Sequence, residues 1–259
     1  HVLGLGREPS GPCHRIATAE GSSGAYLPVH EGRGIRCLFP EIHEIEIPII
    51  RSLDDFRRWA LSDRFPDRGR IDFVAGRIEV DMSPEDLFCH GAPKAAIGAK
   101  LFQRIEHADR GHVLIGRSRI SVPAADLSVE PDVLFISHES LDSGRMRLVP
   151  KVGGEPGRYV EVEGAPDLIV EIVSDSSVTK DTERLPAAYA AAGVREFWLV
   201  DARKEPLVFR IHHWSEGAYC PAETDSEGYQ RSSVLDCRFR LDAARDARGH
   251  WKFSLLDRP

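Results

Sequence analysis

Residues 166–201 constrain the fold more than any other stretch, because they indicate a strand, a helix and a second strand in succession. The first run, LIVEI at 168–172, is apolar except for Glu171, which is typical of a strand buried on both faces of its sheet. The second run, EFWLVD at 196–201, is also largely apolar. Together these runs predict a right-handed parallel crossover, and therefore an α/β core.

The helix between the two strands is indicated by an apolar stripe with helical spacing. Its residues are Leu185, Ala188, Tyr189 and Ala192. Asp181 precedes the stripe as a candidate N-cap, and Gly193 follows it, where a left-handed residue commonly ends a helix. The connection between the strands is therefore expected to be helical.

The length and composition favour one domain with extensions, because 259 residues of 42% hydrophobic composition can bury one sizeable core. We expect this core at 51–205, with an N-terminal extension at 1–50 and a β-rich extension of the same domain at 206–259. Residues 1–34 are rich in Gly, Pro and Ser and are expected to be disordered. Residues 37–50 predict an edge strand or a docking arm.

The charge and the cysteines exclude several classes of protein. A net charge of -7 argues against non-specific wrapping of nucleic acid, although it is compatible with a local basic groove. The five cysteines show no CxxC or CxxH spacing, which disfavours a disulfide framework and a zinc site and fits a reducing compartment. No apolar stretch approaches the ~20 residues of a membrane helix. We therefore expect a cytoplasmic protein.

The other segments predict the remaining elements of the core. A short helix follows Ser52, and residues 71–82 alternate in polarity around a turn at Ala75 and Gly76. This alternation predicts a hairpin of two half-exposed antiparallel strands. A helix is expected up to about Asp109, strands at 112–116, 117–122 and 129–136, a surface insertion at 137–163, and further antiparallel strands after residue 206.

Two carboxylates, Asp132 and Glu171, lie in strands that are too apolar to leave an ionised group without a partner. Paired acids of this kind bind a hard divalent cation such as Mg²⁺ or Mn²⁺, which can orient a water for attack on a phosphodiester. Alternatively, Glu171 pairs with an arginine such as Arg117 or Arg119, and Asp132 caps a turn after Pro131. The spacing leaves both interpretations open.

Three further residues have a functional and a structural interpretation. His90 lines the site from the helix or simply packs on the surface, and the structural role is favoured for a single histidine. Asp167 begins a strand, where an acid more often caps the turn. Tyr189 is assigned mainly to packing.

Four blocks of the sequence together resemble the Uma-two-type family of bacterial endonucleases, a branch of the PD-(D/E)XK restriction-endonuclease-like superfamily. The blocks are DFVAGRIEV at 72–80, EPDVLFI at 130–136, PDLIVEIVS at 166–174 and YAAAGVREFWLVD at 189–201. The resemblance covers roughly residues 52–201. It implies an α/β fold with a restriction-endonuclease-like αβββαβ core and a mixed central sheet, together with an N-terminal hairpin and a C-terminal antiparallel extension.

The resemblance also implies the chemistry of the site. Asp132 and Glu171 would be the metal ligands, the carbonyl of Ile172 would be a further ligand, and Asp72 would lie nearby. The implied cofactor is Mg²⁺ or Mn²⁺, and the implied partner is DNA. A homodimer is expected, since the superfamily cuts two strands.

The chain departs from the family at its lysines. The superfamily lysine two residues after the second acid falls at Val173, and a lysine four residues before the helix tyrosine falls at Leu185. Lys180 and Arg184 are nearby substitutes, although an arginine stays charged and only stabilises a phosphate. Two classes therefore stay open: a metal-dependent DNA endonuclease, and a non-catalytic module with the same fold that binds nucleic acid or protein.

Overall fold

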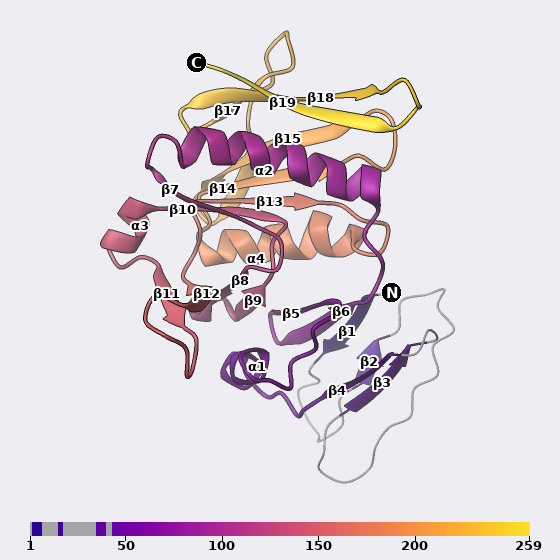
Figure 1. The fold of residues 1–259 in the computed structure, drawn as a ribbon, viewed down its shortest axis with the longest axis vertical. Coiled ribbons are helices and arrows are strands. Elements are labelled where there is room, and N and C mark those ends of the chain that lie inside the picture. Colours follow the sequence, from indigo (N-terminus) through magenta and orange to yellow (C-terminus); the bar gives the residue numbers. More distant parts are fainter. Residues whose placement is uncertain (1, 7–14, 18–34, 40–42) are drawn as a thin grey trace.

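The computed structural model describes residues 2–6, 15–17, 35–39 and 43–259 (Figure 1). Its centre is a six-stranded sheet in the order β16-β15-β14-β13-β10-β7. Strands β13 and β14 are parallel, and the other neighbours are antiparallel, so the sheet is mixed as predicted. Its strands are β7 (Gly111–Ile115), β10 (Val133–Ser137), β13 (Leu168–Ile172), β14 (Glu196–Asp201), β15 (Val208–Ser215) and β16 (Ala218–Pro221).

The two faces of this sheet are covered by different helices (Figure 1). On one face, α2 (Ala92–Ile105) packs Ile97 and Leu101 against residues such as Val170. On the other face, α4 (Leu185–Ala192) packs Tyr189 against Ile169. The succession α2, β7, β10, β13, α4, β14 is the expected αβββαβ core. Alternate side chains of a strand point to opposite faces, so Glu171 shares the α4 face with Ile169.

A second sheet of eight strands has the order β11-β12-β8-β9-β5-β6-β1-β2. The predicted hairpin is confirmed, with its turn at Ala75 and Gly76, and the helix α1 (Leu53–Ala60) packs Phe56 on its apolar face. The bounds of the strands in this part are β5 (Arg70–Val74), β6 (Arg77–Asp81), β8 (Arg119–Val122), β9 (Leu127–Val129), β11 (Arg147–Pro150) and β12 (Tyr159–Glu163).

Two expectations for this region are wrong. Residues 129–136 were expected to form one strand, but the chain leaves β9 in the second sheet and enters β10 in the central sheet, so that Asp132 lies between them. Residues 137–163 were expected to form a surface insertion; residues 151–160 are exposed, but the segment is wrongly described as a mere excursion, because it supplies α3 (His138–Asp142), β11 and β12. Strand β12 runs parallel to β8 and is therefore part of the sheet.

The N-terminal segment contains strands where disorder was expected. Strand β1 (Val2–Gly6) pairs antiparallel with β6, and β2 (Arg15–Ala17) pairs with β1. The rest of residues 1–34 lies outside the described residues. Strands β3 (Ile35–Phe39) and β4 (His43–Ile47) form a hairpin, and Ile45 and Ile47 of β4 are buried. A docking role for residues 1–50 stays a prediction.

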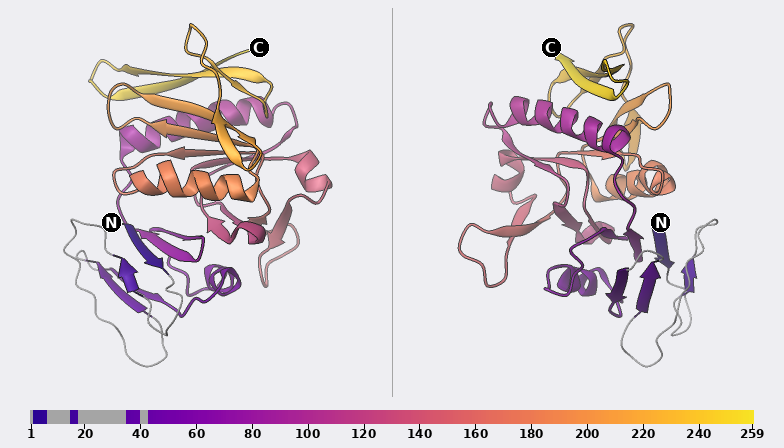
Figure 2. Two further views of the ribbon diagram at one scale, coloured as in Figure 1. Left: turned by 180° about the vertical axis from the view of Figure 1, so that it is seen from behind. Right: turned by 45° about the vertical axis from the view of Figure 1, so that its right-hand side comes forward.

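The C-terminal segment forms the antiparallel sheet β17-β18-β19 over α2, as Figure 2 also shows. Its strands are β17 (Gln230–Ser232), β18 (Cys237–Arg245) and β19 (Trp251–Arg258). Phe239 and Leu255 join the core cluster that contains α2. Within the described part of the chain, no helix has the length and apolar character needed to span a membrane.

The buried carboxylate of Glu196 fixes this segment to the central sheet. Its oxygens accept hydrogen bonds from Trp198 Nε1 at 2.7 Å and Ser232 Oγ at 2.6 Å. The backbone N–H of Ser233 donates to the same carboxylate at 2.8 Å. Since three donors would lose their acceptor together, the two parts are expected to unfold as one unit.

We therefore expect Glu196→Ala to lower the free energy of unfolding by about 2–4 kcal/mol, because buried donors are left without a partner. Urea denaturation followed by circular dichroism measures the change. Glu223→Ala, which removes an exposed acid from the same segment, is the control and is expected to change stability by less than about 0.5 kcal/mol. Equal effects of the two substitutions would contradict the role of Glu196.

Candidate active site

The register of β10 and β13 brings Asp132 and Glu171 together. Val133 lies opposite Val170 in this antiparallel pair, so the next position along brings Asp132 opposite Glu171. The two residues are 0% and 1% exposed, respectively. The predicted pair of buried acids is therefore adjacent in space. Asp132 lies just before the start of β10, where the chain passes from the second sheet to the central one.

Asp132 is surrounded by hydrogen-bond donors and positive charges. Its Oδ2 accepts from the backbone N–H of Ile172 at 2.8 Å, and its Oδ1 accepts from Arg70 Nη2 at 2.7 Å. His90 Nε2 lies 3.2 Å from Oδ2. Burial alone would raise the pKa of Asp132, but Arg70 and then His90 outweigh it and hold that pKa well below its usual value. Asp132 is therefore ionised.

His90 reaches Asp132 from the π-helical turn η1 (Leu87–Gly91), which precedes α2. Its Nδ1 lies 2.6 Å from Glu85 Oε1, so the ring is held between two carboxylates. Burial lowers the pKa of His90, but the contacts with Asp132 and Glu85 together outweigh burial and raise that pKa. The sequence favoured a packing role for His90, whereas the structure brings it into contact with Asp132. Lys94 on α2 is a further cation, 3.8 Å from Asp132 Oδ1.

Glu171 has a different environment from Asp132. The Tyr189 hydroxyl donates to its Oε1 at 2.5 Å, so the tyrosine does more than pack. Its Oε2 is buried and has no hydrogen-bond partner among the described residues. Burial, followed by the negative charges of Asp132 and Asp181, raises the pKa of Glu171 well above its usual value. The two acids thus have opposite preferences for a proton.

One arginine that the sequence did not single out contacts both acids. Arg70, the first residue of β5, lies 2.7 Å from Asp132 and places its Nη1 3.9 Å from Glu171 Oε2. Arg117 and Arg119, the expected partners, are engaged elsewhere: Arg117 donates to the carbonyl of Asp67 and Arg119 pairs with Glu130. The available signal was the alternation of the hairpin, which puts Arg70 on the same strand face as Asp72.

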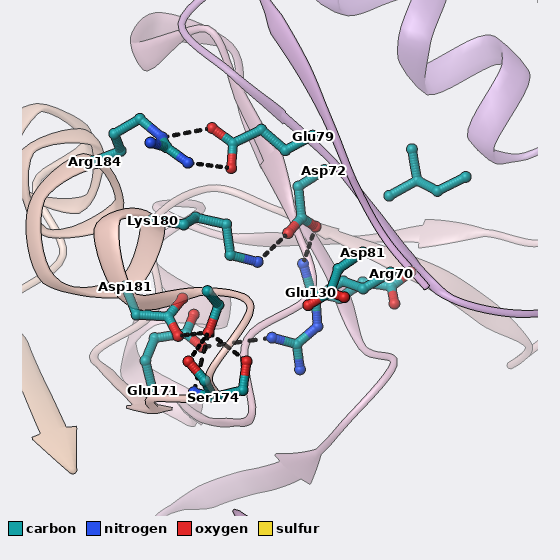
Figure 3. A network of polar contacts seen from close by, with 12 residues as sticks. Arg70, Asp72, Glu79, Asp81, Glu130, Glu171, Ser174, Lys180, Asp181 and Arg184 are labelled. Carbon is teal, nitrogen blue, oxygen red and sulfur yellow. Dashed lines mark hydrogen bonds and ion pairs between the residues drawn. The ribbon is translucent and has the colours of Figure 1, made fainter. Parts of the chain in front are cut away.

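The polar face of the hairpin is buried against the π-helical turn η3 (Lys180–Arg184), as Figure 3 shows. Lys180 Nζ donates to Asp72 Oδ2 at 3.1 Å, and Arg184 binds both oxygens of Glu79, at 2.7 and 3.0 Å. Asp72 and Glu79 are each 2% exposed. The expectation of half-exposed strands was therefore wrong, because ion pairs rather than water satisfy these acids.

Lys180 and Arg184 differ in how much freedom their contacts leave. Burial alone would lower the pKa of Lys180, but the charges of Asp72, Asp181 and Glu171 together outweigh it and raise that pKa. Lys180 therefore stays protonated and cannot act as a general base. The guanidinium of Arg184 is held by Glu79 in a bidentate pair, which fixes its orientation.

Asp181 and Asp167 do not contact Asp132 or Glu171 through any hydrogen bond of the described structure, and each has other partners. Asp181 was expected to be an N-cap, but it is buried and accepts from the Ser177 hydroxyl. Burial raises the pKa of Asp181 to about 6, and its Oδ1 has no hydrogen-bond partner among the described residues. Asp167 accepts from the N–H of Ser137 at 2.8 Å and pairs with Arg145, which fits the structural role favoured from the sequence.

The side chains at this site offer oxygen atoms suited to a hard divalent cation. Glu171 Oε2, buried and without a hydrogen-bond partner in the described structure, is the observation that favours such a cation. No group of three or more His, Cys, Asp or Glu side chains in the described ranges has an arrangement that could hold a metal ion. The protein would thus supply two carboxylates, with the other ligands coming from backbone, water or substrate.

Comparisons with known proteins identify a family and a similar structure. A family model described as "Uma2: Putative restriction endonuclease" matches residues 53–244. Among solved structures, the chain is similar to "a putative nuclease belonging to DUF820 from Anabaena variabilis ATCC 29413". The identity is 17%, the match covers 73% of this chain and 92% of that chain, and the TM-score is 0.49. None of the curated proteins is similar enough to this chain to match it.

The opposite pKa directions of the two acids predict opposite effects on stability in the absence of metal. The raised pKa of Glu171 means that stability is lost as the pH rises above its usual value of 4.5, so Glu171→Gln is expected to stabilise the protein at neutral pH. The lowered pKa of Asp132 contributes stability above its usual value of 3.8, so Asp132→Asn is expected to destabilise it.

Thermal denaturation in EDTA from about pH 5 to pH 8 measures both effects. The advantage of Glu171→Gln over the parent is expected to grow with pH across this range. Shifts of the same sign for both variants at neutral pH would show that the two acids do not hold their protons differently.

Proposed function

Because the chain belongs to the Uma2 family, whose model matches residues 53–244, we propose that it is a metal-dependent endonuclease that hydrolyses phosphodiester bonds in DNA. The observation that carries this proposal is the buried pair of acids, Asp132 and Glu171, in which one carboxylate oxygen has no hydrogen-bond partner among the described residues. A structural ion pair has no need of such an oxygen, whereas a cation site does.

Asp132 and Glu171 would hold Mg²⁺ or Mn²⁺, with the carbonyl of Ile172 as a further ligand. When bound, the cation activates a water and stabilises the leaving oxygen of the phosphodiester. Asp132 is already ionised and oriented by the N–H of Ile172, so it is ready to bind. The raised pKa of Glu171 means that metal binding would compete with a proton for this carboxylate, and the Tyr189 hydroxyl holds its other oxygen in place.

Lys180 is the better replacement for the family lysines. The two family positions are Val173 and Leu185 in this chain, which are 0% and 1% exposed. Lys180 donates one hydrogen bond to Asp72. An ammonium group has three N–H donors, so it can also donate to a phosphate. Arg184 already gives two N–H groups to Glu79. We assign Lys180 the stabilisation of phosphate charge and not the removal of a proton, because its pKa is raised.

DNA is the substrate that the family relationship favours, and a homodimer would provide one site for each strand of a duplex. The acidic net charge of -7 requires that binding be local to the site rather than spread over the surface.

A second function, a non-catalytic module that binds nucleic acid or protein, is favoured by one observation. Arg70 and His90 already compensate the charge of Asp132 without any metal. In this alternative the acids would form a permanent ion-pair network that maintains the fold, and the chain would bind its partner without cleaving it.

Metal binding separates the two functions. Calorimetric titration with Mg²⁺ and Mn²⁺ is expected to show binding to the parent, and a plasmid-nicking assay is expected to show cleavage in the same buffers. Asp132→Asn and Glu171→Gln are nearly isosteric, and each is expected to weaken metal binding at least about tenfold because a charged ligand is lost.

Glu139→Gln, which changes an acid outside the site, is the matched control and is expected to bind metal like the parent. A parent that binds no metal and nicks no DNA would favour the non-catalytic module. Equal metal binding by the parent and both site variants would place the cation elsewhere.

The assignment of Lys180 predicts different effects for the two substitute cations. Lys180→Gln is expected to lower single-turnover cleavage by ~100-fold, whereas Arg184→Gln is expected to have a smaller effect on cleavage, since its charge is committed to Glu79. Thermal denaturation of both variants corrects for unfolded protein. The reverse order of the two cleavage rates would transfer the role to Arg184.

A further inference from the structure

Arg70 is the one residue in the described structure whose guanidinium lies within ion-pair distance of both Asp132 and Glu171. Its two terminal nitrogens are divided between the acids, one at 2.7 Å from Asp132 and the other at 3.9 Å from Glu171. It therefore occupies the interval between the carboxylates in which a bound cation would contact both. A metal ion held by both acids would compete with Arg70 for their oxygens.

Arg70 differs from the other cations of the site in its access to solvent. The Arg70 side chain is 23% exposed, whereas Lys180 is 2% exposed and is enclosed with Asp72. Arg184 is 32% exposed, but both oxygens of Glu79 hold it in place. Arg70 is thus the cation that contacts the acids and also borders the solvent from which a substrate arrives.

The backbone beneath Arg70 is fixed, so that its movement is confined to the side chain. Gly69, the preceding residue, has a left-handed φ of +77°. A Cβ at this position would lie 2.3 Å from Met82 Sδ and 2.9 Å from the carbonyl oxygen of Asp81, so β6 packs directly on it. Arg70 also pairs with Asp81 in the strand register.

We propose that Arg70 is an exchangeable counter-ion: in the metal-free protein it neutralises Asp132 and lies beside Glu171, and it binds a phosphate of the DNA once the two acids hold a metal ion. This inference rests on the proposed function, and it adds a residue that contacts the substrate. The exchange leaves no charge without a counter-ion, because the divalent cation would face the two acids and the released guanidinium would meet an anionic phosphate.

The chemistry of the arginine side chain suits both stages. A guanidinium presents parallel N–H donors that match a carboxylate or a phosphate equally well. Once the metal draws the oxygens of Asp132 toward itself, Arg70 loses its nearest anion, and its long side chain can turn to the solvent side without a change in the backbone. A phosphate bound there would be held beside the metal-bound acids.

The experiment compares Arg70→Gln with the parent in two binding measurements. Calorimetric titration with Mn²⁺ alone is expected to show about tenfold tighter binding to Arg70→Gln, because the metal no longer displaces an ion pair. Fluorescence anisotropy with a labelled DNA duplex is expected to show about tenfold weaker binding by the variant in Ca²⁺, and nearly equal binding in EDTA, where Arg70 is held by the acids.

Two further variants complete the design. Arg77→Gln removes an exposed arginine from the same hairpin and is expected to leave Mn²⁺ binding unchanged and to alter DNA binding equally with and without metal. Arg70→Lys keeps the positive charge but lacks the planar guanidinium, and it replaces Arg70→Gln if that variant does not fold. We expect its Mn²⁺ affinity to stay near that of the parent and its DNA affinity in Ca²⁺ to fall.

The outcomes distinguish this inference from the proposed function. If the parent binds Mn²⁺ but Arg70→Gln binds it no more tightly, or loses DNA affinity equally in Ca²⁺ and EDTA, Arg70 is only a structural partner and the inference fails. If only Arg70→Gln binds Mn²⁺, Arg70 is a permanent counter-ion, which refutes both the exchange and a metal-dependent parent. If neither protein binds Mn²⁺, both proposals fail.

Discussion

Two carboxylates cannot lie side by side in an apolar sheet without compensating positive charge, and this constraint links the separate parts of the molecule. The cations come from outside the central sheet: Arg70 from the hairpin and His90 from the turn before α2. The hairpin and α1 have an apolar cluster of their own, distinct from the clusters on the two faces of the central sheet. The acids at 132 and 171 therefore add polar contacts between the hairpin and the central sheet, beside the packing of Val74 of β5 in the cluster on the α4 face.

The contact between the hairpin and the turn η3 follows the same logic. Asp72 and Glu79 are cross-strand neighbours, and each is matched with a cation of η3, Lys180 and Arg184, respectively. Buried ion pairs add little net stability, because desolvation offsets most of their attraction. Their directional hydrogen bonds do fix the register of the two elements, which a purely apolar surface would allow to slide. A site that needs cations in defined positions benefits from this rigidity.

The features that were predictable from the sequence depend on local patterns. The uniform apolar run around Glu171 predicted a doubly covered strand, and the two isolated acids in such runs predicted their own proximity. Partner identity was not predictable, because Arg70 lies 62 residues from Asp132 and no local pattern connects them. The hairpin at 71–82 was expected to be half-exposed for a related reason. Its polar and apolar residues alternate, and this pattern is the same whether the acids are in water or paired with a buried lysine. Similarly, the run of apolar residues at 129–136 does not indicate that the chain passes from the second sheet to the central sheet at Asp132.

The replacement of the family lysines changes the kind of catalysis that this site can perform. Val173 and Leu185 are both fully buried, so a lysine at either position would need a new partner, and positive charge enters instead from Lys180 on the turn η3. Asp72 keeps that lysine protonated, as the raised pKa of Lys180 indicates, which excludes it as a general base. Proton removal from the attacking water would then fall to the solvent or to the substrate phosphate. What Lys180 can contribute is fixed positive charge near the phosphate, and preorganised charge of this kind is usually the largest contribution to lowering a barrier of this type.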